Sequence, residues 1–266
     1  MMLVQMAPHS EKLREWAKKQ EHGLRDYIRP KLEGEPYFRR LAIEFRTFCD
    51  PSGLILDLGC GIEPQPAYAV SSPRSTYVGI DPLQGCHKRT FDFVRAIGEA
   101  LPFGLAMFDW VLCATALDHF LDPLRALAEA RTILKPSGRL GLWIGVVDWS
   151  YFHRMYAFPS LRDRRNWARL SMLIRHQNYR KLATVILRHL IVNRVRRLLV
   201  YWRRWTDERR LIDSVFAERA MGHFHFYKEE EILAVLDESG FQVVRHGVVA
   251  DAEHGNSLFV VARPGL

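Results

Sequence analysis

The chain has 266 residues, of which 48% are apolar and 26% are charged. These values are typical of a folded globular protein and exclude disordered and collagen-like chains. No run approaches the roughly 18 apolar residues that a membrane-spanning helix needs. The first residues also lack the basic flank and apolar core of a signal peptide. We therefore expect a cytoplasmic protein with one large domain, or a core domain with one insertion.

The net charge is +8, and its distribution is uneven. Residues 151–212 contain 16 Lys or Arg and three acids, a net charge of +13, so the rest of the chain carries −5. An excess of positive charge favours an anionic partner. We therefore expect any anionic partner to bind residues 151–212.

Two helices are expected at the start of the chain. Residues 10–28 form a charged stretch with Ser10 as a plausible N-cap. Residues 35–48 place Pro36 in the first turn of a helix with one apolar stripe. Asp50 and the Pro-Ser-Gly after it indicate a loop.

Short apolar runs, each followed by turn residues, come next. An amphipathic helix is expected at 123–134, between the fourth and fifth runs. Continuous apolar strands that alternate with helices predict a parallel sheet buried on both faces. The segment after the second run is too short for a full crossover helix. The five expected strands are 54–58, 76–80, 91–96, 108–113 and 140–147.

The rest of the chain interrupts this pattern and then resumes it. Residues 151–212 predict long helical stretches, followed by a helix at 228–238 and strands at 241–246 and 256–263. The expected domains are an N-terminal helical lid (1–50), a cofactor-binding core (51–150), a basic helical insertion (151–222) and the C-terminal part of the core (223–266).

The strongest local signal stands at the end of the first strand, where Asp57 is followed by Gly59 and Gly61. Glycines allow a sharp turn close to a ligand, and a helix after the turn would present unpaired N–H groups. Asp81 ends the second strand about 20 residues later, where an acid can accept both hydroxyls of an adenosine ribose. Without this acid, the glycines would mark only a tight turn.

Further stretches follow in order: Gly98 to Phe103, Phe108 to Leu112, Asp118 to Pro123, and Leu134 to Leu140. With these, the chain from Leu54 to Trp143 resembles the class I S-adenosylmethionine-dependent methyltransferases, in particular the type 11 group. The resemblance implies an α/β fold with a doubly wound, mostly parallel seven-stranded sheet, and S-adenosyl-L-methionine as cofactor. A dinucleotide-binding dehydrogenase would need a third glycine where Pro64 stands.

The resemblance assigns cofactor-binding roles around the first two strands. Asp57 resembles the acid that orders the methionine ammonium group. Gly59 and Gly61 resemble the glycines that let the loop pass under the amino-acid portion. Asp81 would hold the ribose, with Pro82 beside the adenine.

Gly98 and Glu99 resemble the acidic turn that flanks the base, and Ala114 would lie near the methionine moiety. Two positions depart from the family pattern. Glu63 replaces a frequent glycine, and Ile97 stands where many relatives have an Asp that reads the adenine amino group. Asp109 is expected to have a structural role at the start of its strand.

His119 follows the fourth strand, at the sheet edge where ligands of such folds bind. In related O-methylases a His in this loop, paired with an acid after the fifth strand, is the usual base, and Asp148 occupies that second position. The alternative is that His119 only packs the loop. His223 and His225 are rival candidates for lining the acceptor pocket. No Cys or acid cluster supports a metal site, and the four widely spaced cysteines favour neither a disulfide framework nor zinc.

The basic insertion contains an amphipathic stretch. One interpretation is a helix packed on the core with its arginines in solvent. The other is an anionic partner, such as a membrane surface, a phosphorylated substrate or RNA, although no RNA-binding module is recognisable. The apolar face comprises Ile191, Val192, Val195, Leu198, Leu199, Trp202 and Trp205, and the basic face comprises Arg194, Arg196, Arg197, Arg203 and Arg204.

Together these features predict a methyltransferase that acts by direct displacement on a small molecule, sugar or glycan-lipid intermediate. The insertion would place the protein at the periphery of an anionic membrane. Two alternatives are an RNA methyltransferase that uses the arginine-rich insertion, and a non-catalytic cofactor-binding partner of another protein.

Overall fold

The computed structural model describes residues 36–69, 75–83, 88–146, 225, 227–250 and 256–265. All of them belong to one of the two compact units into which the chain divides, the unit of residues 1–146 and 220–266. The helix expected at 10–28 lies outside the described residues, as does the basic insertion of 151–222. Among the helices that are described, none has the length and apolarity to cross a membrane.

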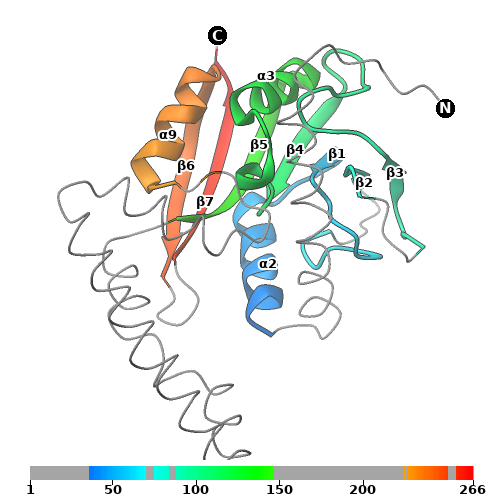
Figure 1. Cartoon of the computed structure of the whole chain (residues 1–266), viewed down its shortest axis with the longest axis horizontal. Coiled ribbons are helices and arrows are strands. Elements are labelled where there is room, and N and C mark those ends of the chain that lie inside the picture. Colours follow the sequence, from blue (N-terminus) through cyan, green and yellow to red (C-terminus); the bar gives the residue numbers. More distant parts are fainter. Residues whose placement is uncertain are drawn as a thin grey trace, which may run out of the picture. The chain divides into compact units, whose positions relative to one another are not determined.

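Seven strands form one sheet in the order β3-β2-β1-β4-β5-β7-β6 (Figure 1). Strands β1 to β5 pair in parallel, whereas β7 is antiparallel to both of its neighbours. This arrangement confirms the doubly wound, mostly parallel seven-stranded sheet. The strands are β1 (Gly53–Leu58), β2 (Ser75–Ile80), β3 (Asp92–Val94), β4 (Phe108–Ala114), β5 (Leu134–Val146), β6 (Phe241–Val249) and β7 (Asn256–Pro264).

Helices cover both faces of the sheet. Successive residues of β4 alternate between two apolar clusters, with Val111 in one and Leu112 in the other, because side chains along a strand point to opposite faces. The first cluster includes α3 (Pro123–Ile133) and α9 (Glu229–Glu238), and the second includes α2 (Pro36–Cys49). The central strands are therefore buried on both sides.

Helix α2 is a core helix. Its Phe45 is fully buried and lies 5.4 Å from Phe259 and 5.9 Å from Trp143, measured between ring centroids. The predicted domain division assigns residues 1–50, and with them α2, to a helical lid. In the structure the apolar stripe of α2 packs against one face of the sheet. The lid stays a prediction for the residues before Pro36.

The structure refines two expected elements. The strand expected at 91–96 is shorter, Asp92–Val94, and β5 begins at Leu134, earlier than expected. The register between β4 and β5 shifts near its start, because Phe108 pairs with Leu134 whereas Trp110 pairs with Arg139. The Lys-Pro-Ser-Gly stretch is therefore an irregular beginning of the strand.

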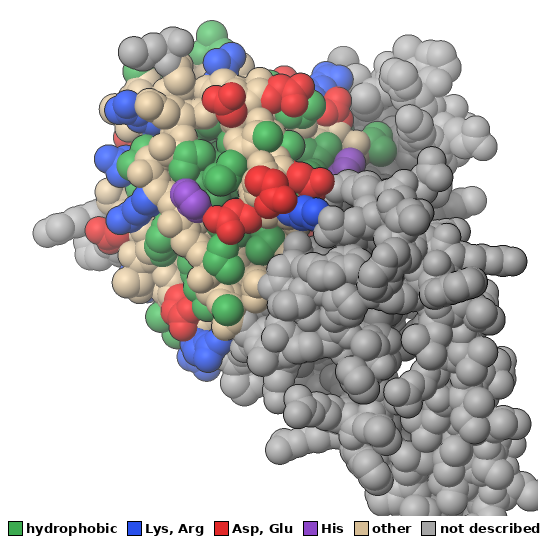
Figure 2. Space-filling view, turned by 90° about the vertical axis from the view of Figure 1, so that its left-hand side faces the viewer, with side chains coloured by type: hydrophobic (Ala, Val, Ile, Leu, Met, Phe, Trp, Pro, Cys, Tyr) green, Lys and Arg blue, Asp and Glu red, His purple; other side chains and the backbone are tan. Residues whose placement is uncertain are grey.

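One face of the described unit carries charged side chains of both signs. In Figure 2, several Asp and Glu side chains lie near its middle, with Lys and Arg side chains around and between them. The first turn of α9 contributes Glu229, Glu230 and Glu231, and a carboxylate oxygen of Glu229 lies 3.1 Å from Nδ1 of His246.

Candidate functional site

A tight glycine turn follows β1. Gly59 and Gly61 adopt φ values of +82° and +71°, which residues with a Cβ atom rarely adopt. The N–H groups of Gly59 and Cys60 both donate to the carbonyl oxygen of Ile80, at 2.9 Å each. A Cβ atom on Gly59 would lie 2.4 Å from the Cβ atom of Ala116. The turn thus needs glycine for its backbone conformation and for its contact with the loop after β4.

The sequence predicts a helix directly after this turn, and for residues 59–69 that prediction is wrong. Residues 59–69 contain bends and turns only. Pro64 and Pro66 remove two backbone N–H donors from this stretch, which disfavours a helix. The N–H group of Thr90 donates to the carbonyl oxygen of Pro64 at 3.0 Å. The described turn therefore has no helix N-terminus to offer a ligand.

Asp57 is fully buried at the end of β1. Its Oδ2 accepts hydrogen bonds from the hydroxyl groups of Tyr68, at 3.0 Å, and Tyr77. Burial, and then the nearby Asp57 carboxylate, raise the pKa of the Tyr77 phenol well above its ordinary value. Tyr77 therefore stays protonated and serves as a donor. Sequence reasoning missed both tyrosines, since neither belongs to the glycine motif.

Asp81 joins the end of β2 to the glycine turn. Its Oδ2 accepts from the N–H group of Gly61 at 2.9 Å, and its Oδ1 accepts from that of Leu83 at 2.8 Å. The side chain is buried, with 8% exposed. Since Asp57 pairs with Gly79 in the register of β1 and β2, the two acids end neighbouring strands at the same edge of the sheet.

The carboxylates of Asp57 and Asp81 both affect the pKa of the Cys60 thiol in the turn. Burial, then Asp57 and then Asp81, raise the pKa of Cys60 far above its ordinary value, although Arg89 acts in the opposite direction. Cys60 is therefore a neutral thiol at physiological pH and cannot serve as a nucleophile. The local charge comes from the two carboxylates and Arg89.

Gly98 and Glu99 pack against the loop after β4. Oε1 of Glu99 accepts from the N–H groups of Leu121, at 2.8 Å, and Asp122, at 3.2 Å. A Cβ atom on Gly98 would lie 3.2 Å from the ring of Phe120. Glu99 thus anchors this loop, and its place beside the adenine stays a prediction.

His119 lies in a short 3-10 helix that follows β4, Leu117–His119. Buried Ala114 ends the strand, and Thr115 then adopts a positive φ of 54°. Nε2 of His119 lies 4.0 Å from Oδ1 of Asp118, and both side chains are mostly buried, with 20% and 15% exposed. Asp118 is the acid that the structure places beside His119. The predicted partner Asp148 lies outside the described residues.

His225 returns to the same loop from beyond the basic insertion. Its N–H group donates to the carbonyl oxygen of Asp118 at 3.3 Å, and its Nε2 lies 3.0 Å from the carbonyl oxygen of Phe120. Because a carbonyl oxygen only accepts, Nε2 carries the hydrogen. The ring stacks on Tyr227, at 5.9 Å between centroids. The other rival, His223, lies outside the described residues.

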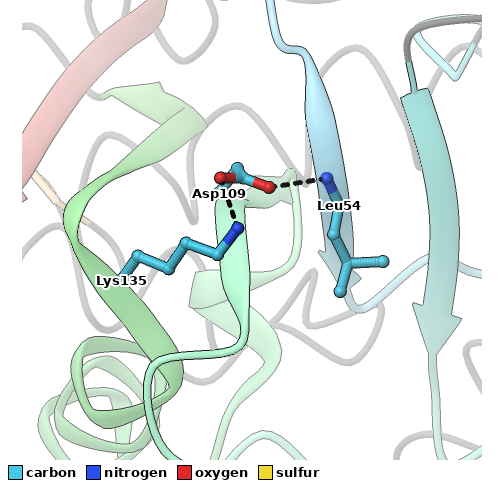
Figure 3. A network of polar contacts seen from close by, with 3 residues as sticks. All are labelled: Leu54, Asp109 and Lys135. Carbon is cyan, nitrogen blue, oxygen red and sulfur yellow. Dashed lines mark hydrogen bonds and ion pairs between the residues drawn. The ribbon is translucent and has the colours of Figure 1, made fainter.

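Asp109 has the structural role that the sequence predicts. At the start of β4 its two carboxylate oxygens accept from the backbone N–H group of Leu54, at 2.9 Å, and from Nζ of Lys135, at 2.7 Å (Figure 3). These bonds, above all that of Lys135, hold the pKa of Asp109 below its ordinary value. They join β1, β4 and β5 at the end of the strands opposite to the glycine turn.

Within the described ranges, no group of three or more His, Cys, Asp or Glu side chains could hold a metal ion. Cys49, Cys60 and Cys113 are buried free thiols, and burial raises the pKa of Cys49 to about 12. The polar side chains described at the edge of β1, β2 and β4 include carboxylates, tyrosine hydroxyls, histidines and the guanidinium group of Arg89.

A comparison with protein families matches the stretch of chain that contains this edge. Residues 56–142, from β1 to β5, match the family model of a methyltransferase domain. We refer to residues 56–142 as the methyltransferase domain. The methyltransferase domain thus contains all the described residues for which the sequence predicts cofactor binding.

Curated relatives match part of this chain over part of their own length. An uncharacterized methyltransferase of Mycolicibacterium gilvum is 32% identical over 106 residues, which are 34% of this chain and 40% of the relative. This chain spans 40%, 31% and 51% of the lengths of three curated relatives.

Solved structures share the fold of the methyltransferase domain. The 1,6-didemethyltoxoflavin-N1-methyltransferase of Burkholderia thailandensis, solved with bound 1,6-didemethyltoxoflavin and S-adenosylhomocysteine, is 15% identical, with a TM-score of 0.56 over 100% of this chain and 94% of that one. A putative methyltransferase in complex with the Haloferax volcanii Trm112 activator is 12% identical, with a TM-score of 0.59 over 93% and 97% of the two chains. At such identities the likeness concerns the fold alone.

Proposed function

We propose that the protein is an S-adenosylmethionine-dependent methyltransferase whose cofactor binds at the edge formed by the ends of β1, β2 and β4. The observation that carries this proposal is the pair of buried acids, Asp57 and Asp81, on either side of a turn that only glycine can form. Carboxylates suit a ligand with an ammonium group, a sulfonium centre and ribose hydroxyls. The family match of the surrounding residues supports the same conclusion.

The residues present fit this cofactor. Asp57 is fully buried and its Oδ2 accepts from two tyrosine hydroxyls; its proposed role is to order the methionine ammonium group through its negative charge, without an exposed carboxylate oxygen. Both oxygens of Asp81 already accept backbone N–H groups, which fixes the carboxylate while its remaining lone pairs can accept ribose hydroxyls. Gly59 leaves the turn without a side chain. When bound, S-adenosylmethionine supplies a methyl group to the acceptor by direct displacement.

The acceptor is proposed to be a small molecule, sugar or glycan-lipid intermediate. His119 is proposed as the group that accepts its proton, because it follows β4 at the ligand-binding edge and lies beside Asp118. A neighbouring carboxylate stabilises a protonated imidazole. The toxoflavin-precursor methyltransferase of similar fold, which binds a small molecule, supports this acceptor class by analogy.

The basic insertion is proposed to serve acceptor or surface binding, apart from the cofactor site. Its predicted amphipathic stretch has arginines on one face and two tryptophans on the other, a pattern typical of helices that lie on anionic membranes. The protein would then be cytoplasmic and peripheral to the membrane.

Calorimetric titration of the full chain with S-adenosylhomocysteine tests the cofactor proposal. We expect saturable binding, and we expect Asp57→Asn and Asp81→Asn each to weaken it by about tenfold or more, because each removes a charged hydrogen-bond acceptor. Glu230→Gln, which neutralises an exposed acid of α9, is the matched control. Absence of binding to the unmodified chain would refute the proposal.

The acceptor class needs a second measurement. The protein and methyl-labelled S-adenosylmethionine are incubated with a metabolite extract or with total RNA from the producing cells. We expect label in the small-molecule or lipid fraction. Label transferred to RNA would instead establish the alternative of an RNA methyltransferase.

A further inference from the structure

Arg89 connects the two turns that flank Asp81. Its Nη2 donates to the carbonyl oxygen of Gly61 at 2.8 Å and to that of Leu83 at 3.2 Å. The N–H groups of these same two residues donate to the carboxylate of Asp81. Gly61 and Leu83 are therefore each held twice, by the acid through the N–H group and by the arginine through the carbonyl oxygen.

The guanidinium group is also held from a third direction. Its Cζ atom lies 3.6 Å from the centroid of the Phe93 ring, a distance at which a cation and an aromatic face attract each other. Arg89 itself is half-buried. A planar guanidinium can stack and donate at the same time, which a lysine ammonium cannot do. Arg89 thus joins residues that follow β1 and β2 to a residue of β3.

The contacts of Arg89 lie where the described residues after β1 and β2 contain no helix. The described residues between β2 and β3, 81–83 and 88–91, contain no helix. The described turn after β1 contains none either, and Pro64 and Pro66 lie in it. Packing of a helix against the sheet would ordinarily hold such strand ends in place. Here hydrogen bonds of a side chain take over that task beside Asp81.

We propose that Arg89 is a positioning residue of the cofactor site, which holds the turns after β1 and β2 in the geometry in which Asp81 receives the ribose. This inference rests on the proposed function. Arg89 would affect binding of the ribose through Asp81, whereas Asp57 would affect binding of the amino-acid part of the cofactor. The two sides can be separated with ligands that contain one or both parts.

The test uses the full chain and two ligands, S-adenosylhomocysteine and 5′-methylthioadenosine, which keeps the ribose but lacks the amino-acid group. We expect Arg89→Ala to raise the dissociation constants of both ligands by the same factor, about tenfold. Arg89→Lys should stay similarly weak, because one ammonium group cannot reproduce the planar arrangement. Asp57→Asn should weaken the binding of S-adenosylhomocysteine alone.

Two controls separate positioning from a loss of folding. Arg95→Ala removes another arginine that donates to a backbone carbonyl oxygen, that of Pro82 at 2.9 Å, but in an exposed bond, so we expect less than about a twofold change. Guanidinium ion at low millimolar concentration should restore ligand affinity to Arg89→Ala only. A variant that was merely less stable would gain nothing from guanidinium, which destabilises folded proteins.

The outcomes distinguish this inference from the proposed function. If the unmodified chain binds neither ligand, both fail. If it binds both ligands, three results would overturn the role of Arg89 alone: unchanged affinity in Arg89→Ala, full affinity in Arg89→Lys, or equal losses in Arg89→Ala and Arg95→Ala. Equal losses for both ligands together with rescue by guanidinium would establish it.

Discussion

Several acidic residues in the range 56–142 accept backbone or tyrosine hydrogen bonds, and the positions of four of them in the fold separate their roles. Asp57 and Asp81 lie at the carboxyl ends of β1 and β2, beside the glycine turn. Asp109 lies at the opposite end of β4, where it joins three strands. Glu99 anchors the loop after β4. Every buried acid needs hydrogen-bond donors around it, so the presence of donors does not distinguish a ligand site. A position at the carboxyl ends of the parallel strands does favour one.

Replacement of Asp109 by Asn should reduce stability without affecting the ligand site. At pH 7 we expect a loss of about 1 kcal/mol in the free energy of unfolding, because the charged acceptor of two hydrogen bonds is removed. The measurement is urea denaturation, with Asp92→Asn, an exposed acid of β3, as the control.

The pH dependence gives a second readout for Asp109. Its pKa is lower in the folded chain than its ordinary value of 3.8. The carboxylate therefore stabilises the fold above that value, and this stabilisation is lost as the pH falls through the folded pKa. The difference between the original chain and Asp109→Asn should narrow below about pH 4. A constant difference from pH 7 to pH 3.5 would contradict this role.

At the scale of elements, the turn after β1 and the loop after β4 are built against each other. Gly59 leaves the space that Ala116 fills, and the loop is fixed by Glu99 on one side and by His225 on the other. His225 follows the basic insertion in the chain. The loop that carries His119 is thus held by residues distant in sequence, and its geometry depends on both parts of the interrupted domain.

Replacement of Gly59 by Ala should disrupt this contact. The added Cβ atom would lie 2.4 Å from that of Ala116, at a φ of +82°, so we expect a loss of at least about 2 kcal/mol in the free energy of unfolding, and weaker binding of S-adenosylhomocysteine. Gly145→Ala is the matched control, because its Cβ atom would meet nothing within 4 Å. Equal stability of the two variants would show that the turn can shift at little cost.

At the scale of the whole molecule, charge divides the chain. Residues 151–212 carry a net +13 and the remainder −5, and in the described unit the first turn of α9 carries three glutamates. An acidic unit alone would be repelled by an anionic membrane. Any attraction to such a surface must therefore come from the basic insertion.

Sedimentation with anionic liposomes tests this division. We expect the full chain to sediment with them at low salt, and we expect reversal of charge at Arg196, Arg197, Arg203 and Arg204 to abolish sedimentation, since each basic residue near the surface contributes about 1 kcal/mol. Neutral phosphatidylcholine vesicles serve as the control. Affinity for S-adenosylhomocysteine should stay within about twofold. Sedimentation that survives charge reversal, or loss of cofactor affinity with it, would contradict the division.

Much of the fold could be predicted from the sequence, because the signals are local. Continuous apolar runs predict buried parallel strands, and the glycine turn with Asp81 about 20 residues later indicates a nucleoside site. The order of the strands at the C-terminal end, with β7 between β5 and β6, depends on contacts between distant residues and came from the structure.

The sequence by itself determined the type of domain and the two acids at the carboxyl ends of β1 and β2, because spacing along one strand and one turn is enough to specify them. Only the tertiary structure decided what surrounds those acids. It brought Tyr68 and Tyr77 to Asp57, joined Arg89 to both turns beside Asp81, and made α2 a core helix. These contacts join strands and loops that lie far apart in the chain, so no local pattern could reveal them.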